Sequence, residues 1–387
     1  MSRTMALFGG PKKTSYLGVD IGAGGLKIVE LSSEKGRAAL QTYGYSEQRP
    51  GEALFSPFDD TKKTGELLAE ICKKSGTKTM TAMTALGLSN VFSAIVAVPR
   101  RKDQKELKQL VDAQVSKLTP LPLSEMITYS TFVDEIKEKA PEKKDKKKKE
   151  EAPAAGPLGK QLTADEKTKR DYVRVLVTGA AKTLIQKYIE IFKYAKLNLT
   201  AIDTESFALI RSLVGKDKSA IMILDMGSTR TNITVVEKGI PFLTRSINIG
   251  GNAVTKRIME QMHVSQEQAQ QLKTDLGLMG GGMTVTAGMP AILEAVMAPI
   301  INEIRYSFQL YANMELTELK KVEKIILTGG SSHLPRVPEY LAETLNMNVY
   351  RGDPWARVVY PEELRPVLDE IGPRMSVAIG LAMREIE

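Results

Sequence analysis

A turn motif that occurs twice, about two hundred residues apart, constrains the fold of this 387-residue chain more than any other feature. The segments YLGVDIGAGGLKIVEL (16–31) and AIMILDMGSTRTNITVVEKG (220–239) share an order: apolar strand, Asp, any residue, Gly, small polar turn, second strand. The first turn is followed by a strand pattern rather than a helix pattern, so the motif predicts a β-hairpin. Two copies predict two related lobes that face one ligand.

The glycine-rich turns are suited to bind a polyphosphate. Backbone N–H groups in such turns point into a concave nest that accepts phosphate oxygens. The two predicted nests are Gly22, Ala23, Gly24 and Gly25, and Gly227, Ser228 and Thr229. Asp20 and Asp225, each at the end of a strand, are expected to bind Mg2+ beside the phosphates through water, and Lys27 to reach bridging oxygens. The chain contains no GxxxxGK[ST] motif, and GAGGLK has Lys27 where a dinucleotide fingerprint needs glycine.

Length and composition indicate a multidomain protein of a reducing compartment. A chain of this length with 42% hydrophobic residues exceeds the size of a single core, and the low aromatic share of 6% is common in layered α/β proteins. Cys72 is the only cysteine, so an internal disulfide is excluded. We find no apolar stretch of about 20 residues and no export-signal pattern at the start. We therefore expect a cytoplasmic protein that contacts a membrane only through partners.

The formal net charge of +8 does not indicate a nucleic-acid partner. Residues 137–150, KEKAPEKKDKKKKE, hold eight lysines against four acids and contribute half of the excess. Such a run buries too little apolar surface to order itself, so 137–169 is predicted to be a disordered loop. It lies between two predicted strands, Thr128–Val133 and Tyr172–Val177, which we expect to be neighbours.

The motifs identify a family resemblance. Asp20, Gly22 and Lys27 look like the first phosphate motif of the actin, sugar-kinase and heat-shock ATPase superfamily. Asp225, Gly227 and Thr231 look like its second, and Gly329, Gly330 and Ser331 in LTGGS like its adenosine motif. Within this superfamily the chain resembles the PilM family of type IV pilus assembly, with the division protein FtsA as a near relative. The likeness covers nearly the whole chain, including the block from ALGLSNVFSAIVAVPRRKDQKEL, the segment SINIGGNAVTKRI and the closing SVAIGLAMREI.

The resemblance implies an α/β, actin-like ATPase fold with two RNase H-like lobes around a nucleotide cleft and an extra subdomain called 1C. Lobe I (IA) is expected from 16–81 and 197–217, with a C-terminal helix at 372–387 packing back on it. Subdomain 1C is expected at 82–196, and lobe II at 219–371 with its smaller part, IIB, at about 252–285.

By the same resemblance, ATP with Mg2+ is the expected cofactor. Base and ribose would lie near Gly250, Gly251 and Lys256, with Gln270 and Lys273 on the helix that closes over them. Two departures from the family weaken the expected activity. Ala23 and Gly24 stand where serines are usual, and Gln270 stands where a carboxylate usually holds a ribose hydroxyl. We expect at most a slow ATPase.

The water-activating residue is expected just before the second phosphate turn, and both Glu205 and Asp203 qualify, with Glu205 preferred. A carboxylate at the start of a helix also fits a purely structural role there. His263 and His333 stand alone in polar turns, so neither a metal site nor a catalytic triad is expected of them.

Two classes of function remain open. The resemblance implies a scaffold in which ATP sets the angle between the lobes, and the N-terminal peptide of a PilN-like inner-membrane protein binds in a groove between lobe I and 1C. Other pilus inner-membrane proteins, and self-association, are further expected contacts. The alternatives are an FtsA-like division filament, or an ATP-dependent small-molecule kinase on the same fold, for which no acceptor base stands out.

Overall fold

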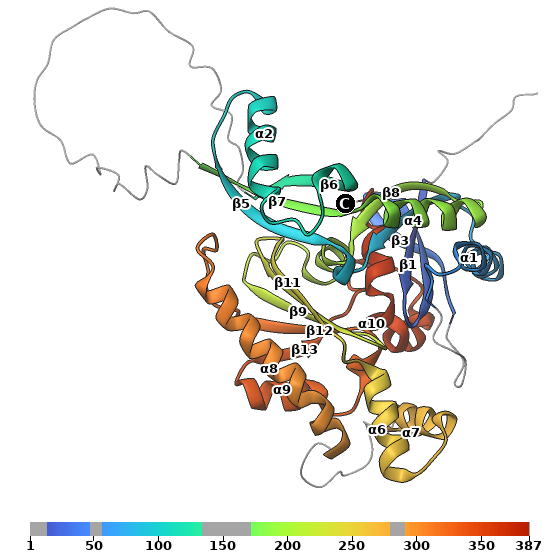
Figure 1. The fold of residues 1–387 in the computed structure, drawn as a ribbon. Coiled ribbons are helices and arrows are strands. Elements are labelled where there is room, and N and C mark those ends of the chain that lie inside the picture. Colours follow the sequence, from blue (N-terminus) through green and yellow to red (C-terminus); the bar gives the residue numbers. More distant parts are fainter. Residues whose placement is uncertain (1–13, 47–55, 134–171, 279–290, 387) are drawn as a thin grey trace, which may run out of the picture. The chain divides into compact units, whose positions relative to one another are not determined.

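The structure is a computed structural model, and it describes residues 14–46, 56–133, 172–278 and 291–386. The predicted disordered loop, 137–169, lies outside these residues. The chain forms two compact units (Figure 1). The larger contains the described parts of 1–91 and 183–387, and the smaller the described parts of 92–182. Across the described stretches, no helix combines the length and apolar character that a membrane span needs.

The first sheet of the larger unit begins with the predicted hairpin. β1 and β2 pair antiparallel with Asp20 opposite Lys27, and β4 then pairs parallel with β1. The six strands follow the order β14-β3-β2-β1-β4-β8. Their bounds are β1 Ser15–Gly22, β2 Gly25–Glu34, β3 Arg37–Tyr45, β4 Thr81–Leu86, β8 Asn198–Thr204 and β14 Val358–Val359.

The second sheet has the same arrangement of an antiparallel hairpin and a parallel third strand. β9 and β10 pair antiparallel with Asp225 opposite Asn232, and β12 pairs parallel with β9. The order is β11-β10-β9-β12-β13. The bounds are β9 Ile221–Met226, β10 Thr231–Glu237, β11 Ile240–Ile247, β12 Lys324–Thr328 and β13 Asn348–Arg351. The predicted motif therefore occurs twice, in two sheets that share an antiparallel hairpin and a parallel third strand.

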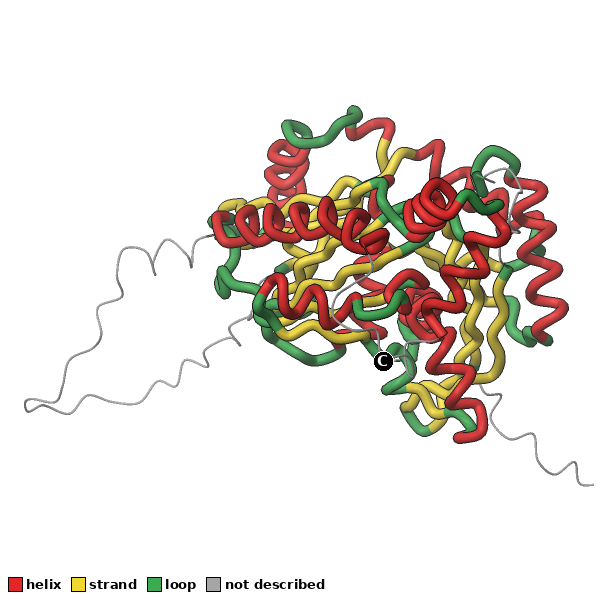
Figure 2. Tube along the Cα trace, turned by 90° about the horizontal axis from the view of Figure 1, so that it is seen from below, coloured by secondary structure: helices red, strands yellow, loops and turns green. Residues whose placement is uncertain are grey.

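Helices flank the strands of both sheets (Figure 2). α10 packs on β1, β2, β4 and β12 and so touches both sheets. The approach is close, because a Cβ on Gly18 of β1 would lie 1.9 Å from the carbonyl oxygen of Ala378. The helices are α1 Thr61–Ser75, α4 Lys182–Tyr194, α5 Glu205–Leu209, α6 Gly251–Met262, α7 Gln266–Leu278, α8 Ala291–Asn313, α9 Val337–Leu345 and α10 Arg365–Ala382.

The smaller unit is a three-stranded antiparallel sheet in the order β5-β7-β6, with α2 on one face. β6 and β7 pair directly, so the lysine-rich segment does connect neighbouring strands. Valines of β5, α2 and β7 form its core. The elements are β5 Phe92–Pro99, α2 Gln104–Val115, β6 Met126–Phe132 and β7 Tyr172–Ala181.

The unit boundaries differ from the predicted domain boundaries. The smaller unit, 92–182, is shorter than the predicted 82–196, because β4 pairs with β1 and β8, and α4 packs against α1. A Cβ on Gly65 of α1 would lie 2.6 Å from the carbonyl oxygen of Ile191 in α4. The predicted second lobe, 219–371, contains β14, which pairs with β3 of the first sheet. The sequence did not indicate either contact, because the packing of α4 on α1 follows no local pattern and β14 is only two residues long.

Candidate functional site

The two phosphate turns meet in space. A Cβ built on Gly24, in the first turn, would lie 2.9 Å from the Oγ of Ser228 in the second. The adenosine turn joins them: a Cβ on Gly329 would lie 2.5 Å from Oδ1 of Asp225, and Gly329 has a φ of +82°. Gly329 therefore favours glycine, because a Cβ there would also lie 2.5 Å from the Met226 carbonyl oxygen. Three motifs separated by up to three hundred residues surround one location.

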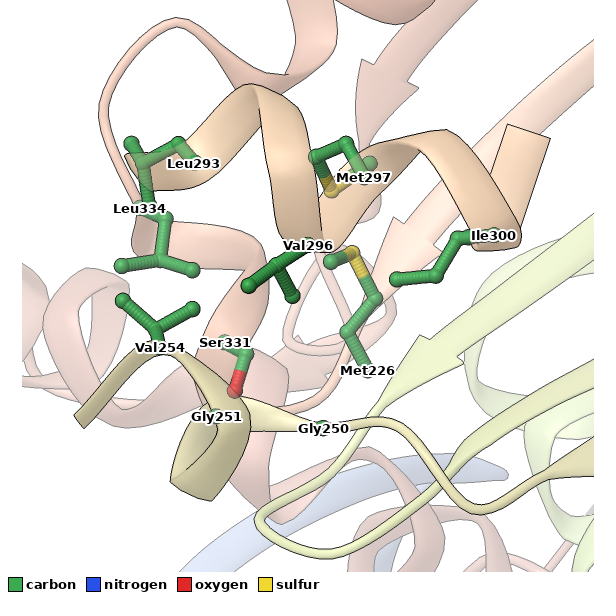
Figure 3. Close-up of a pocket in the computed structure, with 10 residues that line it drawn as sticks. All are labelled: Met226, Gly250, Gly251, Val254, Leu293, Val296, Met297, Ile300, Ser331 and Leu334. Carbon is green, nitrogen blue, oxygen red and sulfur yellow. The ribbon is translucent and has the colours of Figure 1, made fainter. Parts of the chain in front are cut away.

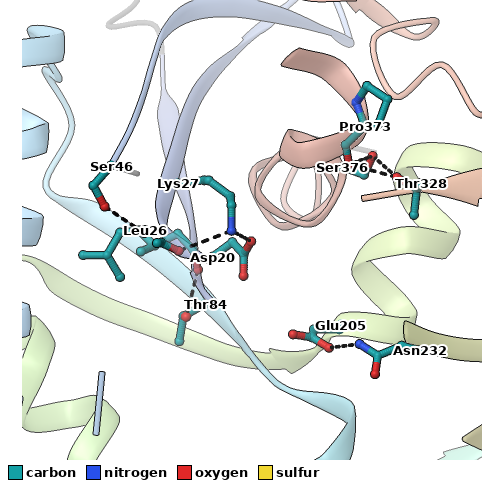
Figure 4. A network of polar contacts seen from close by, with 12 residues as sticks. Asp20, Leu26, Lys27, Ser46, Thr84, Glu205, Asn232, Thr328, Pro373 and Ser376 are labelled. Carbon is teal, nitrogen blue, oxygen red and sulfur yellow. Dashed lines mark hydrogen bonds and ion pairs between the residues drawn. The ribbon is translucent and has the colours of Figure 1, made fainter. Parts of the chain in front are cut away.

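Asp20 and Lys27 form an ion pair across the first hairpin. The Lys27 Nζ lies 3.0 Å from Asp20 Oδ2 and donates a second hydrogen bond to the Gly25 carbonyl at 3.2 Å (Figure 4). Thr84 of β4 donates to the Val19 carbonyl at 2.8 Å and ties the end of β1 to its neighbour. The pairing holds a carboxylate and an ammonium group beside the first glycine turn.

Asp225 lies at the end of β9, within electrostatic range of Asp20. Burial and then the charge of Asp20 raise the pKa of Asp225 to about 6, while Lys27 and a hydrogen bond from Asn232 oppose the shift. Mg2+ binds proteins through one or two carboxylates and fills its shell with water and phosphate oxygens. Among the residues that the structure describes, no three His, Cys, Asp or Glu side chains form a self-contained metal cluster. Asp20 and Asp225 therefore fit a Mg2+ ion that takes one or two carboxylates from the protein and completes its shell with water and phosphate oxygens.

Glu205 is directed toward the same location. It is the first residue of α5, accepts from the Leu88 N–H at 3.0 Å, and accepts from the Asn232 side-chain amide at 3.4 Å (Figure 4). Burial raises the pKa of Glu205 to about 8, with smaller contributions from the charges of Asp20 and Asp225. A carboxyl group poised near neutral pH suits a general base.

Asp203, the alternative base, is paired with a different residue. Its carboxylate forms an ion pair with Arg211, whose guanidinium also donates to the Gly380 carbonyl of α10. It also accepts from the Thr204 N–H at 2.8 Å. The geometry therefore supports the preference for Glu205 over Asp203.

Two residues near the acids were not among the predicted site residues. Asn232 lies opposite Asp225, in the register where Lys27 lies opposite Asp20, so an alignment of the two hairpins would have found it. The Asn232 side-chain amide donates to Glu205 at 3.4 Å, and the Ser246 hydroxyl donates to Asn232 Oδ1 at 2.8 Å. Tyr188 of α4 is buried, and burial with the charges of Glu205 and Asp20 raises its pKa. No motif marks Tyr188, because only packing brings α4 to this location.

The adenosine turn and the start of α6 form a hydrogen-bonded frame. The Gly227 carbonyl accepts from the Gly251 N–H at 2.9 Å and from the Ser331 Oγ at 3.0 Å. A Cβ on Gly250 would lie 2.7 Å from that carbonyl oxygen. Gly330, the remaining glycine of the turn, has open space around it. These residues therefore line one side of the location defined by the phosphate turns.

α7 contributes Gln270 and Lys273 next to this frame. Thr255 of α6 donates to the Gln270 Oε1 at 3.1 Å and accepts from the Lys273 Nζ at 2.8 Å. The Lys273 Nζ also donates to the Gly251 carbonyl at 3.2 Å. Burial, followed by the charge of Arg374, lowers the pKa of Lys273 to about 8. Predicted residues from α6, α7 and the adenosine turn are thus brought together.

Other predicted residues lie differently. Lys256 has a side chain 77% exposed, with its Nζ 3.9 Å from Glu260 on the same helix, and the structure does not bring it to the turns. Thr231 is buried, and its Oγ1 donates to the Ile249 carbonyl at 2.7 Å. This bond joins the start of β10 to the segment before Gly250. Ala23 is exposed at the tip of the first turn, and Thr229 is partly buried in the second.

An apolar pocket lies behind the frame (Figure 3). Gly250 and Gly251 form one edge, the Ser331 hydroxyl lies at the rim, and side chains of β9, α6, α8 and the residue after the adenosine turn form the walls. These are Met226, Val254, Leu293, Val296, Met297, Ile300 and Leu334. Gly250, the residue before α6, and Gly251, its first residue, thus lie between this pocket and the second glycine turn.

Comparison with known proteins finds relatives among bacterial cell division proteins. The chain is 24% identical to the cell division protein FtsA of Borreliella burgdorferi over 242 residues, and 24% identical to that of Bacillus subtilis over 197. The matches cover 55% and 46% of this chain and 54% and 44% of those proteins, so the chain spans about half the length of these relatives.

Solved structures share the fold over nearly the whole chain. A PilM–PilN type IV pilus biogenesis complex matches with a TM-score of 0.74 and 22% identity, covering 97% of this chain and 99% of that one. The ethanolamine utilization protein EutJ of Carboxydothermus hydrogenoformans matches with a TM-score of 0.50 and 14% identity, covering 96% and 90%. The fold is the actin-like ATPase fold. The family model for the type IV pilus assembly protein PilM matches residues 18–146 and 160–386, and the chain therefore belongs to this family.

Proposed function

We propose that this protein is an ATP-binding, actin-like scaffold of type IV pilus assembly in which the nucleotide controls conformation. The observation that supports the proposal is the approach of Gly24 to Ser228, which brings the two glycine turns close together. In this proposal the phosphates of ATP bind between the turns, and the bound Mg2+ neutralises their charge. Asp20 and Asp225 hold the ion through its water shell.

Hydrolysis, where it occurs, is slow in this proposal. Glu205 is the proposed base, because it faces both aspartates while Asp203 is paired with Arg211. Ala23 offers no hydroxyl at the tip of the first turn, where a terminal phosphate would need a donor. Binding energy is thus used to hold a conformation and not to speed up turnover.

We propose that the partner is the cytoplasmic N-terminal peptide of a PilN-like inner-membrane protein. Family membership supports this, as does the likeness to a solved complex whose components are PilM and PilN. The protein would then act at the cytoplasmic face of the inner membrane, together with other pilus proteins. The groove between lobe I and 1C, and self-association, stay predictions from the resemblance.

Calorimetric titration with Mg-ATP tests the nucleotide site. We expect Asp20→Ala and Asp225→Ala to weaken binding at least tenfold, which is about 1.4 kcal/mol. Asp59→Ala, an exposed aspartate, is the control and should leave the affinity unchanged. Binding that survives both site variants would refute the assignment.

Nucleotide control has its own test. The affinity for a fluorescent PilN-like N-terminal peptide is measured by polarisation with no nucleotide, with Mg-ADP and with Mg-ATP. We expect it to differ severalfold between states, because a ligand shifts a conformation only through different affinity for its forms. Equal peptide affinity in all three states would contradict nucleotide control while leaving the binding site intact.

A further inference from the structure

The strand β6 forms one edge of the three-stranded sheet in the smaller unit, and among the described residues no strand pairs with its outer side. Five of its seven residues are exposed. Tyr129, at the centre of the strand, is 73% exposed, and Ile127 and Phe132 are 51% and 44% exposed. An outer strand of this kind presents a row of unpaired backbone N–H and C=O groups beside apolar side chains, and such an edge readily pairs with another chain.

The sequence of β6, MITYSTF, contains none of the residues that commonly prevent such pairing. It has no lysine, no other charged residue and no proline. The opposite edge of the sheet is different, because β5 ends at Pro99 and is followed directly by Arg100, Arg101 and Lys102. The outer side of β6 is therefore the edge of this sheet that is open to a further strand.

The register with β7 determines which backbone groups of β6 face outward. The two strands pair antiparallel, with Tyr129 opposite Thr178. Just beyond the strand, the Val133 N–H donates to the Arg174 carbonyl at 3.0 Å. In an antiparallel pair every second residue bonds to the neighbouring strand, so Tyr129 bonds toward β7 as Val133 does. The alternate residues of β6 direct their N–H and C=O groups to the free edge, and these are Met126, Thr128, Ser130 and Phe132.

A second copy of β6 fits this edge with complete overlap. Antiparallel pairing of all seven residues places Tyr129 opposite its own copy on a two-fold axis. Thr128 then lies opposite Ser130, and since both direct their backbone groups outward, each such pair exchanges two hydrogen bonds. A shift by one residue would instead oppose them to residues that already bond to β7. On the side chains, Ile127 lies opposite Thr131, and no like charges meet because β6 carries no charge.

We propose that β6 pairs with β6 of a second copy of this chain, so that two three-stranded sheets join into one six-stranded sheet across a two-fold axis. This inference goes beyond the proposed scaffold function and does not depend on the nucleotide site. The pairing places the two exposed Tyr129 rings side by side as a cross-strand aromatic pair, which removes apolar surface from water. Because each chain offers β6 once, association through this edge stops at the dimer.

Sedimentation velocity of the full chain over a series of concentrations measures the dimer. We expect the unmodified protein to dimerise reversibly. Tyr129→Lys should weaken dimerisation at least tenfold, because it removes the aromatic pair and opposes two like charges on the axis. Tyr194→Lys, at a similarly exposed tyrosine on α4, is the matched control and should dimerise like the unmodified protein.

Two double variants test the register. Ile127→Lys with Thr131→Glu places opposite charges in facing positions and should keep the dimer, whereas Ile127→Lys with Thr131→Lys places like charges there and should weaken it at least tenfold. A disulfide test is independent of charge. In a Cys72→Ser background, Tyr129→Cys should form a disulfide between two chains, because facing residues of this kind have Cα atoms about 4.5 Å apart. Thr128→Cys, one residue away, is the control and should form little.

The outcomes separate this edge from other contacts. An unmodified protein that stays monomeric at every concentration would overturn the inference without any variant. A dimer that Tyr129→Lys leaves unchanged uses another surface and would also overturn it, as would equal behaviour of the two double variants. Weaker binding of a PilN-like peptide by a monomeric Tyr129→Lys protein would assign the edge to that peptide instead of a second copy. The nucleotide site is tested separately by the Asp20 and Asp225 variants, so failure here leaves the proposed function standing.

Discussion

Replacing Glu205 by Gln should stabilise the nucleotide-free protein, increasingly so as the pH rises. Glu205 shares its surroundings with Asp20 and Asp225, and its pKa is raised from 4.5 to about 8 by burial and then by their charges. Glutamine keeps an oxygen that accepts from the Leu88 N–H, but it cannot ionise. The variant therefore removes a poorly solvated charge and little else.

The sign of the effect follows from proton linkage. Between pH 4.5 and about 8 the folded protein holds the Glu205 proton more tightly than the unfolded chain, so the free energy of unfolding falls as the pH rises through this window. At about 1.4 kcal/mol for each pH unit, the full difference would be about 5 kcal/mol. Because Glu205 is only partly buried, solvent screens part of the penalty, and we expect a loss of about 2 kcal/mol between pH 5 and pH 9.

Chemical denaturation at pH 5, 7 and 9 measures this difference. The unmodified protein should lose stability relative to Glu205→Gln as the pH rises, with near equality at pH 5. Glu190→Gln, an exposed glutamate on α4, is the control and should follow the unmodified protein. A stability difference that is constant with pH, or that favours the unmodified protein at pH 9, would refute the view that burial and the neighbouring acids disfavour the charged form of Glu205.

Three further predictions concern the turns, the metal and the core. Gly329→Ala should weaken Mg-ATP binding at least tenfold in calorimetry, because its Cβ would lie 2.5 Å from Asp225 Oδ1 at a positive φ, whereas Gly330→Ala, with open space around it, should bind normally. Chelation of Mg2+ by EDTA should weaken ATP binding at least tenfold, and unchanged affinity would contradict the assignment of the aspartates. Tyr311→Phe should cost about 1 to 3 kcal/mol in chemical denaturation, because it removes a buried 2.6 Å hydrogen bond to Glu237; a loss below about 0.5 kcal/mol would argue against this.

Much of the local structure could be predicted from the sequence. Apolar residues recur at helical spacing in α1, Thr61–Ser75, and in α9, Val337–Leu345, so both helices follow from local sequence. Both phosphate hairpins and the glycine-containing turn after β12 also follow from short patterns. These features depend on backbone conformation and on the alternation of apolar residues, which neighbours in the chain largely set.

The limits of local patterns are visible at the site. Asp203 and Glu205 are two residues apart and chemically alike, yet one pairs with Arg211 and the other faces the aspartates. Lys256 fitted the expected ribose position by resemblance, but it lies on the exposed face of α6. The direction of a side chain depends on the exact phase of a helix or strand against its neighbours, which a motif does not contain.

The sequence by itself determined that two similar hairpins exist, each with an aspartate at a strand end and an open glycine turn, and that the chain is an actin-like protein of the PilM family. The tertiary structure alone decided that Gly24 approaches Ser228, that β14 pairs with the first sheet, and that Tyr188 is buried. The physical reason is that a turn is encoded by its own residues, whereas the meeting of two turns depends on how α10 packs against both sheets.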